Sequence, residues 1–237
     1  MDEILTALKR TELFSDVPEG VILREIMPHR QLQECRKGLF LIEPQQEMSR
    51  FGVVLAGKIH IMHFFQEGNY SLTAALTAGD LLGADLICTR TRRSPYYAMV
   101  ASTARVVFFP AAMLTEPGIV QEGWRLQILS RLATWISNEN MKKEYRLAIL
   151  SQKGLRDRIV TYLSMQSGKL QKTAFAISFS REELAAFLCV NRSALSHELS
   201  LMEQEGLISF HKNFFALHYL EQPESHSLRG NQPAFPF

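Results

Sequence analysis

The sequence predicts an α+β protein with an antiparallel β-roll in its N-terminal half, a long helix after the roll, and a winged helix-turn-helix at its C-terminal end. From about residue 30 to residue 110, short apolar or alternating runs are separated by turn residues, a pattern typical of meandering β structure. Residues 122–150 contain no proline, which favours one uninterrupted helix. Two short helical segments and two strand-like runs then follow.

Length, composition and charge narrow the class of protein. The 237 residues suffice for two domains, and a hydrophobic content of 46% provides packed cores. The formal net charge is only +2, but bases outnumber acids between Lys142 and Arg192, which favours a polyanionic partner. No apolar run is long enough for a signal peptide or a membrane span. We therefore expect a cytoplasmic protein without a membrane partner.

The N-terminal half begins with an expected amphipathic helix over residues 3–14, whose leucines and isoleucine recur at helical spacing. In the β region that follows, the segment Val53–Ile61 is interpreted as a hairpin, because two apolar runs flank Gly57.

The long helix carries a seam of coiled-coil spacing that turns polar toward its end. The seam positions are Leu129, Leu132, Ile136, Asn140 and Lys143. We interpret the helix as a dimerisation helix; packing against another element of the same chain is the alternative. Gly154 ends this segment, and a second amphipathic helix begins at Leu155.

The C-terminal segment has the signals of a helix-turn-helix. Ser180 and Glu183 form an expected capping box at the start of one short helix. Asn191 is the expected N-cap of a second helix, which runs to about Glu205 before Gly206. The runs "LISF" and "FFALHYL" around "HKN" then predict the two strands of a wing.

The second of these helices has an apolar stripe and an opposite polar face. Leu195, Leu199 and Met202 form the stripe. The polar face consists of Arg192, Ser193, Ser196, His197 and Ser200. A helix of this kind fits the major groove of DNA, where Arg pairs with guanine and Ser or His can donate to several bases.

Three motifs make the chain similar to the Crp/Fnr family of bacterial transcription regulators. They are "GKIHI", "AGDLLGADLI" and "FSREELAAFLCVNRSALSHELSLMEQEGLI". The resemblance implies an effector-sensing β-roll related to cyclic-nucleotide-binding domains (a double-stranded β-helix), a dimerisation helix and a winged helix-turn-helix that binds DNA. The corresponding ranges are 1–117, 118–152 and 153–220, and a flexible tail is expected over 221–237.

The resemblance also implies which residues contact DNA. The family's base- and phosphate-reading positions fall on Arg192, Ser193, Ser196 and His197, and the flanking candidates are Arg181, Asn191 and Lys212. Ser193 stands where many members have Glu, and His197 stands where they commonly have Arg. The DNA sequence that other members recognise therefore does not predict the operator of this protein. Cys189 occupies a turn position where Gly is frequent. The implied partners are an inverted-repeat DNA duplex, a second copy of the chain, RNA polymerase and a small-molecule effector.

The sensor site is predicted from what it lacks. Members that bind cyclic AMP use a Glu after the "GD..G" turn, and this chain has Ala84 at that position. They also use an Arg-Ser pair. The corresponding residues here are Pro95-Tyr96 or, with a shifted loop, Arg93-Ser94. We expect a different small molecule, bound between the roll and the long helix, and no resident cofactor. The candidate residues are Gly83, Ala84, Arg92, Arg93, Tyr96 and Tyr97. The alternative is a sensing module of the same fold that uses a cyclic nucleotide or a redox switch at Cys35 or Cys88.

Metal and enzyme chemistry receive little support from the sequence. Three widely spaced cysteines cannot supply four thiolates for an iron–sulfur cluster, and an axial haem ligand would have to come from His60, His63 or Cys88. A catalytic set of Cys189, His197 and Ser193 or Ser196 would put the thiol in a buried turn and the imidazole on an outward face. We therefore expect no enzyme activity.

Overall fold

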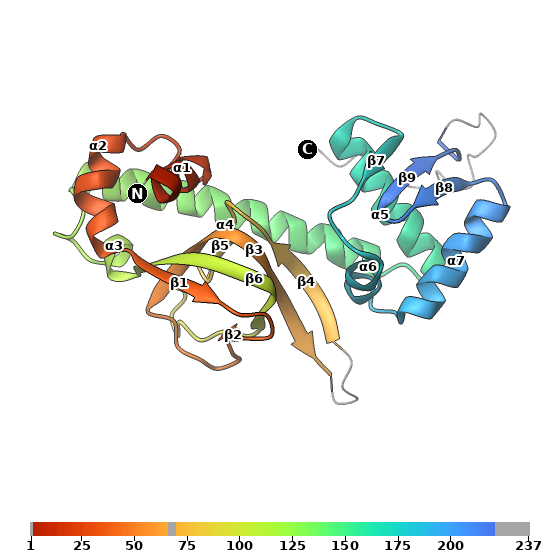
Figure 1. Cartoon of the computed structure of the whole chain (residues 1–237), viewed down its shortest axis with the longest axis horizontal. Coiled ribbons are helices and arrows are strands. Elements are labelled where there is room, and N and C mark those ends of the chain that lie inside the picture. The colour runs from red at the N-terminus through yellow and green to blue at the C-terminus, as the bar shows by residue number, and fades with distance from the viewer. Residues whose placement is uncertain (1, 66–69, 221–237) are drawn as a thin grey trace. The chain divides into compact units, whose positions relative to one another are not determined.

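The structure, a computed structural model, describes residues 2–65 and 70–220 (Figure 1). The chain divides into two compact units, one formed by Met1–Phe64 with Thr73–Lys142 and the other by Phe65–Leu72 with Lys143–Phe237. The predicted tail, residues 221–237, lies outside the described residues. The domain boundaries expected at residues 117 and 152 stay predictions.

The N-terminal unit begins with short helical segments. They are α1 (Asp2–Arg10), α2 (Glu19–Val21), the π-helical turn η1 (Ile22–Ile26) and the 3-10 turn η2 (Met27–His29). Helix α1 is shorter than the predicted range 3–14. The Thr11 hydroxyl donates to the Leu8 carbonyl (2.7 Å) and accepts from the Phe14 amide (3.3 Å), so the chain turns there and the helix does not continue.

An antiparallel β-roll follows these helices, as predicted. Its strands are β1 (Gln31–Cys35), β2 (Phe40–Ile42), β3 (Arg50–Phe64), β4 (Tyr70–Leu76), β5 (Leu81–Leu82) and β6 (Tyr97–Pro110). The sheet order is β1-β6-β3-β4, with β2 on β6 and β5 on β3. Apolar side chains fill the interior of the roll, among them Ile42, Met48, Leu82, Val100 and Phe108.

The predicted hairpin across Gly57 is wrong. Residues 50–64 form one continuous strand, β3, which pairs along its length with β6. The register shifts around Ala56 and Lys58, and Gly57 has φ +87°. A Cβ atom on Gly57 would lie 2.3 Å from the Thr103 carbonyl oxygen. The glycine therefore marks a bulge where two strands approach closely, rather than a turn.

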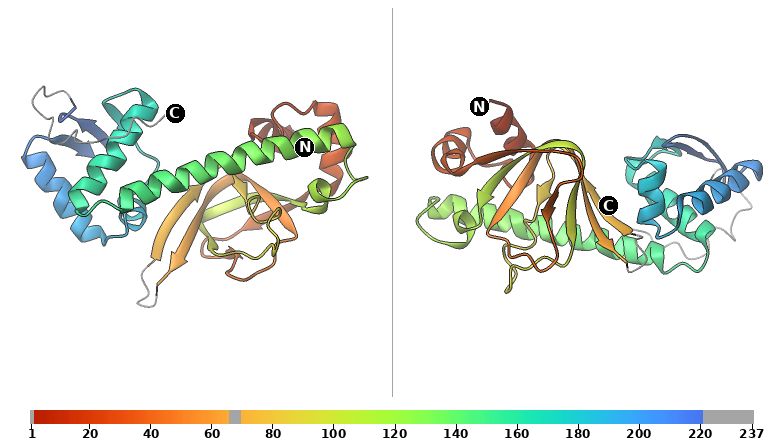
Figure 2. Two further views of the ribbon diagram at one scale, coloured as in Figure 1. Left: turned by 180° about the vertical axis from the view of Figure 1, so that it is seen from behind. Right: turned by 60° about the horizontal axis from the view of Figure 1, so that its bottom comes forward.

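After the short helix α3 (Ala112–Thr115), helix α4 (Glu122–Leu150) is uninterrupted, as predicted. Figure 2 shows the N-terminal part of α4 lying along the roll. The seam assigned to it is wrong in part, because Leu132 is buried in the core of its own chain, where Leu129 and Ile136 also pack. Among residues 2–65 and 70–220, no helix combines the length and the apolar character needed to cross a bilayer.

The C-terminal unit is built on a separate core. Its elements are the end of α4, α5 (Leu155–Leu170), β7 (Ala174–Ala176), α6 (Arg181–Phe187), α7 (Arg192–Gln204), β8 (Ile208–His211) and β9 (Phe214–Leu217). The strands form a sheet in the order β7-β9-β8. Buried side chains from α5, α6, α7 and the sheet meet in one cluster that includes Leu163, Leu184, Leu199 and Phe215. The predicted helix-turn-helix and wing are therefore present.

Candidate nucleic-acid interface

Helix α6 begins at a complete capping box. The Ser180 hydroxyl accepts a hydrogen bond from the Glu183 amide (3.2 Å), and the Glu183 carboxylate accepts one from the Ser180 amide (2.7 Å). Each bond satisfies a backbone donor that the first turn of a helix leaves unpaired. The predicted capping box is confirmed, and it fixes the residue at which α6 starts.

The turn between α6 and α7 contains Cys189 with φ +58°. That backbone region favours glycine, which explains why a small side chain suits this position. Two arginines bind the carbonyls at the end of α6: Arg146 Nη2 donates to the Phe187 oxygen (3.3 Å), and Arg158 Nη1 donates to the Leu188 oxygen (3.2 Å). Cys189 is exposed rather than buried as expected, and its Sγ lies 3.6 Å from Arg146 Nη2.

Helix α7 is capped by Asn191, as predicted. Asn191 Oδ1 accepts hydrogen bonds from the Ala194 amide (2.7 Å) and from the Ser193 hydroxyl (2.8 Å). At the other end, Gly206 has φ +72°, the left-handed conformation that commonly follows a helix. The side-chain oxygen of Asn191 is thus engaged within the protein, which leaves its amide nitrogen as the group for a DNA contact.

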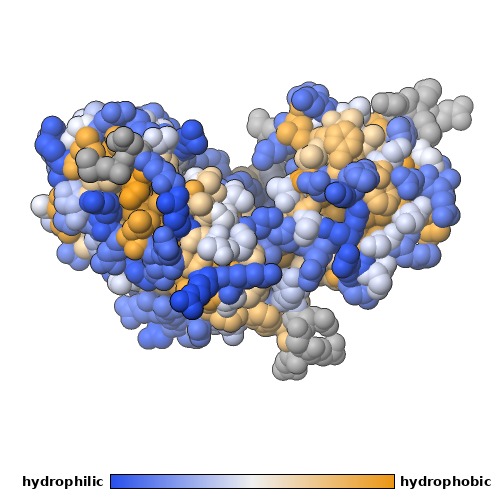
Figure 3. Space-filling view, viewed as in Figure 1, coloured by the Kyte–Doolittle hydropathy of each residue, from blue (hydrophilic) through white to orange (hydrophobic). Residues whose placement is uncertain are grey.

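The two faces of α7 separate as the sequence predicts. Leu195, Leu199 and Met202 have no exposed surface and pack in the C-terminal core. On the opposite side, Arg192, Ser193, His197 and Ser200 are exposed and Ser196 is half-buried. Figure 3 shows mainly hydrophilic and intermediate colours where α7 lies in Figure 1. The structure therefore brings the four predicted reading residues together on one polar surface.

The wing places Lys212 beside this helix-turn-helix through the contacts of Arg181. Lys212 is exposed in the turn between β8 and β9, with φ +53°. Arg181 Nη2 donates to the Lys212 carbonyl (3.0 Å), and its guanidinium lies over the rings of Phe210 (4.8 Å) and Phe215 (5.6 Å). Burial, and secondarily the charge of Arg192, lower the pKa of Arg181. Arg181, predicted to anchor a phosphate, thus also contacts the wing through its turn and its aromatic side chains.

Sequence reasoning missed an ion-pair network on the side of α7. Arg156 of α5 contacts both Glu198 of α7 and Glu205, the C-cap residue of that helix. A signal was present, because Glu198 and Glu205 are seven residues apart and so lie on nearly the same side of a helix. Nothing in the sequence connects them to Arg156, which is more than forty residues away.

The predicted effector residues are spread over different environments. Gly83 (φ +71°) and Ala84 are buried. A Cβ atom on Gly83 would lie 3.3 Å from the terminal carbons of both Ile42 and Met48, so apolar side chains cover this turn. Ala84 has no exposed surface and packs in the core with the N-terminal helices.

The tyrosines and arginines assigned to a pocket rim do not share one rim. Tyr96 lies in the core rather than at a rim, and its hydroxyl donates to Asp85 (2.8 Å). Tyr97 is half-buried and packs against Phe40 and Phe64 instead. Successive residues of an extended chain point to opposite sides, which separates the two tyrosines. Arg92 and Arg93 lie on a loop, where Arg93 Nη1 donates to the Gln45 carbonyl (3.0 Å).

The residues considered for other sensing modes are also separated. Cys35 is buried and burial raises the pKa of its thiol, while Cys88 is exposed. A raised pKa reduces the thiolate fraction on which redox reactivity depends. His60 is buried and His63 is half-buried. In the part of the chain that the structure describes, no three His, Cys, Asp or Glu side chains are grouped as metal ligands would be.

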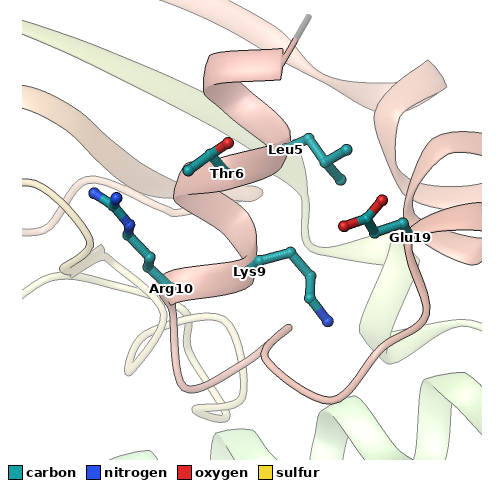
Figure 4. Close-up of a pocket in the computed structure, with 5 residues that line it drawn as sticks. All are labelled: Leu5, Thr6, Lys9, Arg10 and Glu19. Atoms are coloured by element: carbon teal, nitrogen blue, oxygen red, sulfur yellow. The ribbon is translucent and has the colours of Figure 1, made fainter.

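A surface hollow lies away from all of these residues. It has a volume of about 420 Å³ beside α1 and is lined by Leu5, Thr6, Lys9, Arg10 and Glu19 (Figure 4). Lys9 Nζ donates to the Val17 carbonyl (3.0 Å), so this ammonium group already makes a hydrogen bond within the protein. The hollow does not coincide with the predicted effector site.

Comparisons with known proteins agree with this architecture. The sequence model of the Crp-like helix-turn-helix domain matches residues 157–221. Electron transport regulator A of Shewanella oneidensis is 21% identical over 201 residues, which are 83% of this chain and 77% of that protein. The transcriptional activator protein anr of Pseudomonas aeruginosa is 23% identical over 202 residues, which are 83% of this chain and 80% of that protein.

Solved structures show the same fold. FixK2 from Bradyrhizobium japonicum has a TM-score of 0.63 at 17% identity, covering 87% of this chain and 99% of its own. The c-di-GMP responsive global regulator CLP of Xanthomonas campestris has a TM-score of 0.66 at 15% identity, covering 84% of this chain and 99% of its own. The likeness extends over both units, because each alignment covers most of the chain.

Proposed function

The chain is a transcription regulator of the Crp/Fnr family, and from this premise we propose that it binds an inverted-repeat DNA operator as a homodimer under the control of a small-molecule effector. The observation that carries the proposal is the polar face of α7. Arg192, Ser193, Ser196 and His197 lie together on that face, and the opposite side of the helix is fixed in the core by three apolar residues. The proposed site of action is the cytoplasm.

The proposed mode of DNA contact is insertion of α7 into the major groove. The groove admits one helix, and each base pair presents a distinct pattern of donors and acceptors there. Arg192, in the first turn, has the fork of donors that pairs with guanine, while Ser193 and His197 can donate to or accept from several bases. Lys212 at the wing turn and the Asn191 amide suit phosphate oxygens, and these contacts set the position of the helix rather than its sequence preference.

The proposed dimer surface is the exposed side of α4, which shares only Asn140 with the seam expected from the sequence. Leu129, Leu132 and Ile136 pack within the chain, so a partner needs other residues. One set of exposed positions on α4 follows alternating spacings of four and three residues, as a coiled-coil seam does. They are Leu126, Ser130, Ala133, Ser137 and Asn140, here called the α4 outer seam. Two copies related by a two-fold axis would meet an operator with half-sites roughly 34–36 Å apart.

The proposed effector is a small molecule other than cyclic AMP. Ala84, at the position where cyclic AMP-binding relatives have Glu, provides no carboxylate to accept a ribose hydroxyl, and apolar carbons of Ile42 and Met48 lie over Gly83. The half-buried Arg92 and the exposed Arg93 remain candidates for an anionic ligand, and Tyr97 is half-buried. RNA polymerase is proposed as a further partner on the strength of the family alone.

The test removes one reading residue and leaves the fold intact. We expect Arg192→Ala to lower the affinity for a duplex that the wild-type protein selects from a random pool by about tenfold or more, since a bidentate Arg contact is worth about 1–3 kcal/mol. Gel-shift titration at fixed salt measures this. Lys169→Ala, which removes one positive charge from an exposed position near the end of α5, is the matched control and should change affinity little. Equal affinities of Arg192→Ala and wild type would contradict the assignment.

A further inference from the structure

The side of α7 next to α5 is held by one guanidinium and two carboxylates. Arg156, the second residue of α5, donates from Nε to Glu198 Oε1 (2.6 Å). Its Nη1 and Nη2 donate to Glu205 Oε2 (2.6 Å) and Oε1 (2.8 Å). The second pair is bidentate, the geometry in which an arginine–carboxylate pair is strong and directional. We call Arg156, Glu198 and Glu205 the Arg156 clamp.

Two of these charges stand where the dipoles of their own helices disfavour them. Arg156 is a cation in the first turn of α5, and Glu205 is an anion at the C-cap of α7, whereas helix dipoles favour the opposite signs at these ends. The pairing compensates both, and hydrogen bonds from the guanidinium to Glu205 and Glu198 raise the pKa of Arg156. The contact between α5 and α7 therefore explains the presence of Arg156 and Glu205 at these helix ends, and helix propensity does not.

The clamp completes a set of contacts that fixes the rotation of α7 about its axis. The core holds one side of the helix through Leu199 and its neighbours. The Arg156 clamp holds a second side at two points about two turns apart. On a third side, Glu203 Oε1 accepts a hydrogen bond from the Phe210 amide of the wing (3.3 Å). The face that carries Ser193 and His197 is the one these contacts leave exposed.

We propose that Arg156 and Glu198 are positioning residues for DNA reading, which hold α7 at the rotation that presents Arg192, Ser193 and His197 to the bases. The proposal rests on the proposed DNA-binding function. A rotation of α7 by a fraction of a turn would move every reading side chain at once, so the specific affinity would fall while contacts to phosphates, which tolerate displacement, would persist.

The experiment measures a change in DNA affinity whose direction is opposite to the change that the altered charge alone would cause. Glu198→Gln removes a negative charge from a helix that lies against a polyanion, so electrostatics alone would raise the affinity for any DNA. If Glu198 positions α7, the affinity of this variant for the selected duplex should instead fall roughly tenfold. Its affinity for a scrambled duplex should stay unchanged or rise. Arg156→Lys keeps the charge but loses the fork, and it should also weaken binding to the selected duplex. Thermal denaturation by circular dichroism confirms that each full-length variant is folded at the assay temperature.

Controls separate this inference from the function on which it rests. Glu182→Gln removes an exposed acid from α6 outside the clamp, and its affinity should be equal to or above that of wild type. If the wild-type protein enriches no sequence from a random duplex pool, the proposed function fails and this inference with it. If it enriches a sequence that Glu198→Gln or Arg156→Lys binds as tightly as wild type does, the clamp is not a positioning device and the proposed function stands.

Discussion

Cys189 occupies a backbone conformation that most side chains avoid. Its φ of +58° lies in the left-handed region, where a Cβ atom costs about 1–2 kcal/mol relative to glycine. The residue is nevertheless tied to the rest of the unit, because Arg146 Nη2 lies near its Sγ and donates to the Phe187 carbonyl. The backbone requirement and this weak thiol contact together account for a small residue in the turn, and neither involves catalysis.

Substitution at Cys189 tests the backbone explanation. We expect Cys189→Gly to keep the free energy of unfolding within about 1 kcal/mol of wild type, because relief of strain offsets the larger entropy of the unfolded chain. Cys189→Val should lower it by about 1–2 kcal/mol, since a β-branched residue is poorly accommodated at positive φ. Urea unfolding followed by circular dichroism measures both. A glycine variant less stable than the valine variant would contradict the backbone explanation, because both variants lack the thiol and differ only in how well they accommodate a positive φ.

Among the elements, those with local signals were predictable. The capping box at Ser180, the Asn191 cap and the buried stripe of α7 are all specified by residues within a few positions of one another, and the structure confirms each. Strand β3 was not predictable in this way. The sequence around Gly57 is compatible with either a turn or a bulge. The choice depends on Thr103 and Ala104 of β6, which lie close to Gly57 only in the folded roll.

The same distinction explains the error on the long helix and the contact that sequence reasoning missed at the wing. Periodicity identifies the apolar side of α4, but it does not say whether a second copy or the chain's own core covers that side. The N-terminal helices and the roll supply the cover for Leu132. Likewise, the basic character of Arg181 suggested a phosphate contact, whereas its bond to the Lys212 carbonyl depends on the wing's return to the start of α6.

The cap of α7 gives a prediction that separates stability from DNA binding. Asn191→Ala should lower the free energy of unfolding by about 1 kcal/mol, because the Ala194 amide loses its acceptor. Asn191→Asp keeps an acceptor and adds a charge that the helix dipole favours, so we expect wild-type stability. The aspartate should nevertheless weaken DNA binding in a gel shift at fixed salt, through repulsion of phosphates. Equal destabilisation by both variants in urea would show that Asn191 is not acting as the cap.

For the whole molecule, the proposed operator symmetry requires two copies, and the α4 outer seam is the surface at which we propose that they meet. Its central residues, Ser130, Ala133 and Ser137, are small and exposed, which permits close approach of two helices at about 8 Å. Leu126 is 55% exposed and adds apolar area at one end. Asn140 is polar at a seam position, and such a residue can fix register at a cost in stability.

A charge at the centre of this seam tests the arrangement. Ala133→Arg should convert the dimer to a monomer in sedimentation velocity, because two-fold symmetry would bring two arginines into apposition in a seam that small residues line. The monomer would then lose much of its affinity for a duplex with two half-sites while still binding one half-site weakly. Leu32→Arg adds the same charge at a residue of β1 that is 52% exposed, and this variant should sediment as wild type does. A dimer that persists in Ala133→Arg, or dissociates equally in Leu32→Arg, would move the dimer contact away from this side of α4.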